Sequence, residues 1–140
     1  MKLLLKNKIF ITIISIGIVL AVCIIFYQYK DNESYRSSEV SNLIINKLAQ
    51  NSPKTIINTW NFKDKKHIAR FINAFNSKKR LNVKIDIRTP DYSVTIVLTN
   101  NHKENYNLWL DDTSEGIIMN DNKVWKLSKS STESIRKLLK

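Results

Sequence analysis

The chain is poor in the residues that build the common small catalytic and metal sites. Its 140 residues include one cysteine, two glycines, two prolines and two histidines. The single cysteine, Cys23, excludes an intramolecular disulfide and a cysteine-based zinc cluster. No glycine-rich phosphate loop, HExxH motif or Ser-His-Asp arrangement is present in the sequence. We therefore predict no cofactor, no metal ion and no enzymatic activity.

Negative charge is also scarce, and the imbalance is local. Lys and Arg number 23 against 12 Asp and Glu, a formal net charge of +11. Residues 63–88 hold nine of the positive charges against Asp64 and Asp86, whereas the rest of residues 31–140 is balanced at ten of each sign. This segment predicts contact with an anionic surface or partner, although a merely solvated face is the alternative. The candidate contact residues are Lys63, Lys66, Arg70, Lys78, Lys79, Arg80, Lys84 and Arg88.

One long hydrophobic run is present near the N-terminus. Of the 21 residues from 9 to 29, 17 are apolar and none is charged. A helix of that length spans about 30 Å, the thickness of the hydrocarbon layer of a bilayer. The run predicts a single transmembrane anchor at residues 9–29. Three lysines precede it, which favours a cytoplasmic tail at residues 1–8 and an extracytoplasmic C-terminal part.

The segment Leu20–Cys23 partly resembles the cleavage motif of bacterial lipoproteins. Val22, however, stands where a small residue is expected, and apolar residues continue beyond Cys23. An uncleaved anchor is therefore favoured over a lipidated cysteine.

Beyond the anchor the pattern predicts a tether at residues 30–39 and an α+β domain at residues 40–140. Alternating or β-rich apolar residues predict strands near residues 43–48, 56–60, 83–88, 94–98, 106–110, 117–119 and 124–127. Two amphipathic helices are predicted, one from N-cap Asp64 to about Ser77 and one with Ser130 and Glu133 as a capping box. Short turns between the strands predict an antiparallel meander sheet with both helices on one face.

Two turn positions stand out in this domain. Asn100-Asn101 predicts a turn without glycine, because asparagine tolerates a positive φ. Gly116, the only glycine after the anchor, is predicted to adopt a positive φ.

The C-terminal half is similar to a known family. The similarity lies in Pro90-Asp91-Tyr92, in residues 106–110 (YNLWL), in residues 116–120 (GIIMN) and in the aromatic strand followed by a capped helix. These residues resemble the YhfM-like domain of small membrane-anchored proteins and lipoproteins of Firmicutes. The resemblance covers residues 56–140 and implies an extracytoplasmic α+β module, with no family catalytic residues to assign.

Three further candidate sites rest on single features. Trp109 lies out of phase with Leu108 and Leu110, so it is either an exposed aromatic platform or a cover for the second sheet face. Asp111, Asp112, Glu115 and Asp121 gather around two turns, where acids are usually just solvated. His67 and His102 lie among lysines, which disfavours cation binding.

These observations predict a single-pass membrane protein whose C-terminal domain is a non-enzymatic binding module. The expected partner is anionic lipid, wall polymer or an acidic envelope protein, and nucleic acid is disfavoured. The alternatives are an envelope-acting enzyme that uses the acids at 111–121, and a reversed topology with a basic cytoplasmic domain.

Overall fold

The computed structural model describes residues 14–24, 33–82, 88–110 and 115–140. The chain divides into two compact units, Met1–Glu33 and Ser34–Lys140. In the first unit residues 14–24 are helical, and their large apolar side chains are exposed. Among the described residues, no helix combines the length and the apolar character that a membrane crossing requires. The other residues of the predicted anchor, 9–13 and 25–29, lie outside the described residues.

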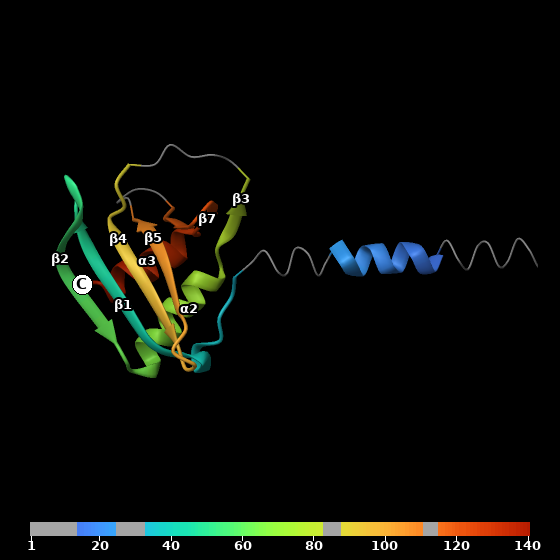
Figure 1. Ribbon diagram of the computed structural model, residues 1–140, viewed down its shortest axis with the longest axis horizontal. Helices are drawn as coiled ribbons and strands as arrows, with labels where there is room; N and C mark the ends of the chain where they lie inside the picture. Colours follow the sequence, from blue (N-terminus) through green and yellow to red (C-terminus); the bar gives the residue numbers. More distant parts are fainter. Residues whose placement is uncertain (1–13, 25–32, 83–87, 111–114) are drawn as a thin grey trace, which may run out of the picture. The chain divides into compact units, whose positions relative to one another are not determined.

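The second unit contains, in its described residues, a seven-stranded antiparallel sheet, two α-helices and one short 3-10 helix (Figure 1). In chain order these elements are η1 (Ser37–Glu39), β1 (Val40–Ala49), β2 (Ser52–Phe62), α2 (Lys65–Asn76), β3 (Lys79–Leu81), β4 (Tyr92–Leu98), β5 (Lys103–Trp109), β6 (Ile117–Asn120), β7 (Lys123–Lys126) and α3 (Lys129–Leu138). The strand order across the sheet is β2-β1-β4-β5-β6-β7-β3. Both helices lie on one face of the sheet, as predicted (Figure 1).

The predicted simple meander holds for only four strands. β4, β5, β6 and β7 pair in sequence order, but β1 pairs with β4, and β3 pairs with β7 at the opposite edge. The cause is the 12-residue helix α2. At 1.5 Å per residue it covers about 18 Å, enough to carry the chain past several strands spaced about 4.8 Å apart. β3 was not predicted, because three residues are too few to show a period, and the strand predicted at 83–88 falls on residues 83–87, outside the described residues.

Both helices begin at a side-chain cap, one of which differs from the prediction. Asp64 caps α2 as predicted, because its carboxylate accepts the His67 backbone N–H at 3.0 Å. The cap of α3 is Ser128 rather than Ser130: the Ser128 hydroxyl accepts the Ser131 N–H at 3.2 Å. Ser130 therefore lies inside the first turn.

One hydrophobic core joins the sheet to the helices. Leu43, Val94, Leu108 and Trp125 from the strands pack in one buried cluster with the α2 face predicted at Ile68, Phe71, Ile72 and Phe75 and with Ile135 of α3. Every residue of this cluster belongs to the second unit. That unit therefore contains a complete hydrophobic core and does not need the first unit to fold.

The domain begins before residue 40, in the segment predicted to be a tether. The Tyr35 ring lies 5.6 Å from the Phe75 ring, and its hydroxyl is hydrogen bonded to the Tyr106 hydroxyl. The Asn76 amide accepts the Tyr35 N–H at 3.0 Å and donates to the Tyr35 carbonyl at 2.7 Å. A single aromatic anchor leaves no period in the sequence, so the tether prediction was wrong for residues 34–39.

The two turn predictions had different outcomes. Asn101 has a φ of 67°, as predicted for the turn between β4 and β5. No described glycine has a positive φ, so the prediction for Gly116 was wrong. Glycine is needed there for space, since a Cβ would lie 3.1 Å from Leu110 Cδ2, Leu127 Cδ1 and the Trp109 carbonyl oxygen.

Candidate functional site

Four of the basic residues are exposed at the start of α2, one just before the helix and three in its N-terminal half. We call Lys63, Lys65, Lys66 and Arg70 the α2 basic cluster; all four are exposed. Lys66 and Arg70 are four residues apart and are therefore neighbours on the helix surface. Within the described residues, none of the four side chains has a hydrogen-bond or ion-pair partner. Their charges are available to an external anion.

Asp64, the only acidic residue between Lys63 and Arg70, already has hydrogen-bond partners. Asp64 accepts the His67 backbone N–H, and its other oxygen lies 2.6 Å from His67 Nδ1. These two hydrogen bonds, the backbone one first, hold the pKa of the Asp64 carboxyl below its usual value. The His67 ring is also stacked on Phe62, with the ring centroids 5.3 Å apart. The Asp64 carboxylate thus caps α2 and is bonded to His67 at the N-terminus of the helix.

The remaining basic candidates do not join this cluster. Lys78 is 3% exposed, and its ammonium lies 3.8 Å above the centre of the Phe75 ring. Arg80 lies over the Trp125 ring at 5.4 Å, and its buried Nη1 atom has no hydrogen-bond partner among the residues that the structure describes. Lys78 and Arg80 therefore belong to the edge of the core, contrary to the surface role predicted for them.

The other three candidates lie apart. Lys79 is exposed on β3, opposite Lys126 of β7. Arg88 is bound to Asp91 through two contacts, at 2.6 and 3.2 Å. Lys84 lies outside the described residues. The predicted basic segment is thus divided by the fold: in its described residues, the α2 basic cluster and Lys79 are exposed and unpaired, but Lys79 lies apart on β3.

Trp109 is not an exposed platform. Its side chain is 5% exposed, and its indole N–H donates to the Arg88 carbonyl at 2.7 Å. Successive strand residues point to opposite faces, so Trp109 lies on the face opposite Leu108. It therefore covers the second face of the sheet, the alternative considered from the sequence.

The turn acids are dispersed as well. Glu115 pairs with Lys126, with 2.6 Å between Oε2 and Nζ, and Asp121 is an exposed turn residue with a φ of 49°. Asp111 and Asp112 lie outside the described residues. In the described ranges, no three His, Cys, Asp or Glu side chains are grouped so that they could hold a metal ion.

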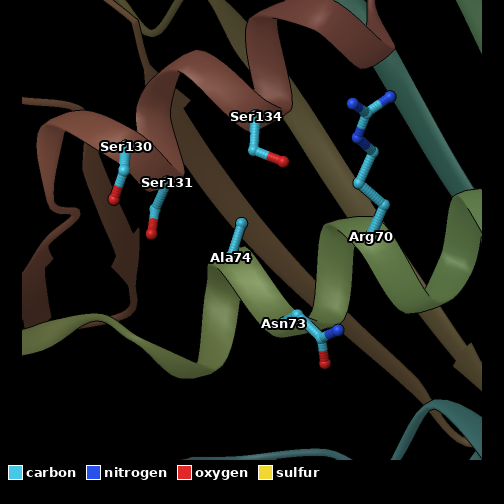
Figure 2. Close-up of a pocket in the computed structure, with 6 residues that line it drawn as sticks. All are labelled: Arg70, Asn73, Ala74, Ser130, Ser131 and Ser134. Atoms are coloured by element: carbon cyan, nitrogen blue, oxygen red, sulfur yellow. The ribbon is translucent and has the colours of Figure 1, made fainter.

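A polar cleft of about 300 Å³ lies between α2 and α3 (Figure 2). We call it the interhelical cleft; it is lined by Arg70, Asn73, Ala74, Ser130, Ser131 and Ser134. Figure 2 shows Arg70 of α2 and Ser134 of α3 on facing sides of the cleft, with Ser130 and Ser131 towards its other end. Arg70 thus belongs both to the cleft and to the α2 basic cluster.

The polar groups of the interhelical cleft differ in availability. The Ser131 hydroxyl is bonded to Ser77 at 2.6 Å and to Ser128 at 2.9 Å, so it ties the two helices together. In the described part of the chain, the side chains of Asn73 and Ser134 have no hydrogen-bond partner. Its described lining includes no carboxylate. Its available side chains are therefore one cation, one amide and hydroxyls.

The serines and Asn73 of this cleft were not among the site residues predicted from the sequence. The pairs Arg70 and Asn73, and Ser130 and Ser134, are each spaced three or four residues apart, which places each pair on one helix face. That spacing was the only signal in the sequence. Nothing local to either helix shows that the two faces meet.

These features define a small α+β domain that presents a basic helix and a polar cleft to solvent. The chain belongs to the YhfM family, because residues 37–140 match the family model described as YhfM protein. It is 22% identical over 135 residues to the uncharacterized protein YhfM of Bacillus subtilis (strain 168), covering 96% of this chain and 95% of that protein.

The fold is also similar to that of a solved structure. A thioesterase-like protein from Clostridium sporogenes ATCC 15579 superposes with a TM-score of 0.53 at 16% identity. The similarity covers 72% of this chain and 94% of that one. At this identity the likeness concerns the fold alone.

Proposed function

We propose that this protein is a membrane-anchored, extracytoplasmic binding module that contacts an anionic surface, either lipid headgroups or a wall polymer, through the α2 basic cluster. One observation carries the proposal: the four cations of the α2 basic cluster, Lys63 just before α2 and three within it, are exposed and, in the described residues, unpaired. Elsewhere in the same residues Arg88, Lys126 and Arg136 each have a carboxylate partner.

The position of the cluster on the helix supports this role. Lys65 and Lys66 lie in the first turn of α2, which contains no acidic residue. The N-terminus of a helix carries partial positive charge, so each exposed lysine there costs roughly 0.3–1 kcal/mol of stability. Lysines in this unfavourable place are expected where the charge itself serves a purpose. Together with the helix end they produce a concentrated positive potential.

The N-terminal segment supports the membrane location. Residues 14–24 are helical, and their exposed side chains include Ile16, Ile18, Val19 and Leu20, which are 55–60% exposed. The apolar run extends in the sequence from residue 9 to residue 29. Three lysines before the run favour an extracytoplasmic domain. Protease treatment of intact cells tests this topology: the domain should be degraded, and its survival would favour a cytoplasmic location.

Vesicle binding tests the anionic contact. The fragment 34–140, which contains the whole core, should bind phosphatidylglycerol vesicles at low salt and lose affinity as salt rises. Each Lys or Arg near an anionic bilayer contributes about 1 kcal/mol, so the variant with Lys63, Lys65, Lys66 and Arg70 changed to Gln should bind at least about 100-fold more weakly.

A matched control separates the cluster from net charge. Lys47, Lys54, Lys103 and Lys140 are exposed outside α2, and changing all four to Gln removes the same charge. This control should retain most of the binding. Equal losses in the two variants, or binding indifferent to salt, would contradict the proposal. Replacing the vesicles with anionic wall polymer in the same series identifies which surface binds more tightly.

A further inference from the structure

We propose that the interhelical cleft holds a single phosphate group, with Arg70 as its charged anchor and the Ser134 hydroxyl as a second donor. This inference deepens the proposed function, because it names the chemical group recognised beside the α2 basic cluster. It rests on that function only in the choice of an anionic ligand.

The unpaired guanidinium of Arg70 determines the sign and shape of the ligand. Arg70 lines the cleft, and within the described residues it makes no hydrogen bond or ion pair. A guanidinium presents its N–H groups as a planar fork that matches two oxygens of a phosphate or carboxylate. In the part of the chain that the structure describes, no carboxylate lines the cleft to occupy that fork. The group that binds there is therefore an oxyanion.

The remaining lining residues favour phosphate over carboxylate. A phosphate has more acceptor oxygens than a carboxylate, so it can contact Arg70 at two points and still present a separate oxygen to another donor. Ser134 faces Arg70 across the cleft (Figure 2), and its hydroxyl has no partner in the described residues. The Ser134 hydroxyl is therefore placed to donate to that separate oxygen, whereas the Asn73 side chain points away from α3.

The other ligand classes fit less well. Ala74 is the only apolar side chain in the lining, so an acyl chain or an aromatic ring would gain little burial. A metal cation would meet Arg70 and no carboxylate. The volume of about 300 Å³ is at the lower end of ligand sites, which suits a phosphate with one small substituent.

The position of the cleft suits a phosphate that belongs to a larger anion. Arg70 lines the cleft, and Lys66 lies one turn away on the surface of the same helix. A phosphate held by Arg70 would thus have Lys66 beside it for the next negative group. A lipid headgroup or a phosphodiester polymer both supply this chemistry.

Phosphate titration of the fragment 34–140, followed by backbone amide NMR, tests the site. Inorganic phosphate should give saturable shifts centred on residues 70, 73 and 134, whereas chloride at equal ionic strength should not. Arg70→Gln should weaken phosphate binding at least about 10-fold, and Ser134→Ala about 3- to 10-fold. Lys54→Gln removes one exposed charge outside α2 and outside the cleft lining, so it should change the affinity less than about two-fold. Thermal unfolding of each variant verifies its fold.

The outcomes separate this inference from the proposed function. No saturation, or equal losses in Lys54→Gln and Arg70→Gln, overturns the phosphate site even if vesicle binding still needs the α2 basic cluster. Loss of phosphate binding in Ser134→Ala supports the site even if the vesicle proposal fails, because the change leaves the charge intact. Titration with glycerol phosphate and with phosphatidylglycerol vesicles distinguishes a soluble source from a lipid source.

Discussion

Asp91 and Arg88 form a two-point ion pair, with Nη1–Oδ1 at 2.6 Å and Nη2–Oδ2 at 3.2 Å. The Asp91 carboxylate also accepts the Leu110 backbone N–H at 2.9 Å, and its backbone carbonyl accepts the Leu48 N–H at 2.9 Å. One residue thus joins the ends of β1, β4 and β5. The Arg88 carbonyl in turn accepts the indole N–H of Trp109. This arrangement gives Pro90-Asp91-Tyr92, one of the segments similar to the YhfM family, a structural purpose.

Asp91→Asn should destabilise the domain by about 1–3 kcal/mol, because the amide cannot replace a two-point, charge-assisted contact. Urea unfolding of the fragment 34–140 measures this loss. Asp121→Asn is the matched control: Asp121 is exposed at a positive φ that asparagine tolerates, so its effect should be close to zero. An Asp91→Asn variant as stable as the control would show that the Asp91 contacts contribute little.

Gly116→Ala should destabilise the domain by about 1–3 kcal/mol, because its new methyl group would press on Leu110, Leu127 and the Trp109 carbonyl, each 3.1 Å away. Chemical unfolding of the full chain, followed by tryptophan fluorescence, reports on this domain, since Trp60, Trp109 and Trp125 all lie in it. Gly17→Ala adds the same methyl group where, in the described residues, no atom beyond its own helix backbone and chain neighbours lies within 4 Å, so it should not change the transition. If Gly116→Ala is neutral, the neighbouring side chains move aside at no cost.

A fragment that begins at residue 40 should be less stable than one that begins at Ser34, by about 2–4 kcal/mol. The shorter fragment loses the Tyr35 ring beside Phe75 and leaves Asn76 without its two backbone contacts. Differential scanning calorimetry of the two fragments tests this difference. Tyr35→Ala in the longer fragment should reproduce most of it, and equal melting temperatures would show that the segment only rests on the domain.

Acid should weaken the start of α2. The pKa of Asp64 is lowered in the folded state, so its contribution to stability is fully present above the usual carboxyl pKa of about 3.8. That contribution is lost as the pH falls through the lower, folded pKa. Asparagine also caps helices but does not titrate. The stability difference between wild type and Asp64→Asn, measured by urea unfolding from pH 6 to pH 2.5, should therefore change only below about pH 4. A difference that is flat with pH would show that the carboxylate is not preferentially stabilised in the fold.

Short-range patterns were the part of the fold that the sequence predicted well. The apolar positions of α2, its cap at Asp64, the alternation in β4 and β5, and the Asn101 turn all occur as expected. Each of these features depends on residues within a few positions of one another. The errors and omissions are different in kind: β3 at the sheet edge was not predicted, the domain begins at Ser34, Ser128 rather than Ser130 caps α3, and Gly116 has no positive φ.

At the candidate site, the positive charges were visible in the sequence, but their burial and pairing were not. Nine positive charges within 26 residues were visible in the sequence, but Lys78 and Lys79 are neighbours of which one is buried and the other exposed. Arg88 is neutralised by a carboxylate three residues away. The interhelical cleft was invisible, because Arg70 and Ser134 are brought together only when α2 and α3 pack.

By itself, the sequence determined the apolar N-terminal segment, the α+β class of the domain and the local excess of positive charge. These features follow from composition and from short hydrophobic periods, which depend only on residues close together in the chain. Only the tertiary structure decided which of those charges remain exposed and unpaired, because the burial of Lys78 over Phe75 and of Trp109 under the sheet depends on contacts between distant residues. The same packing of two helices on one sheet face placed Arg70 beside Ser134 and converted a basic stretch of sequence into a defined cleft.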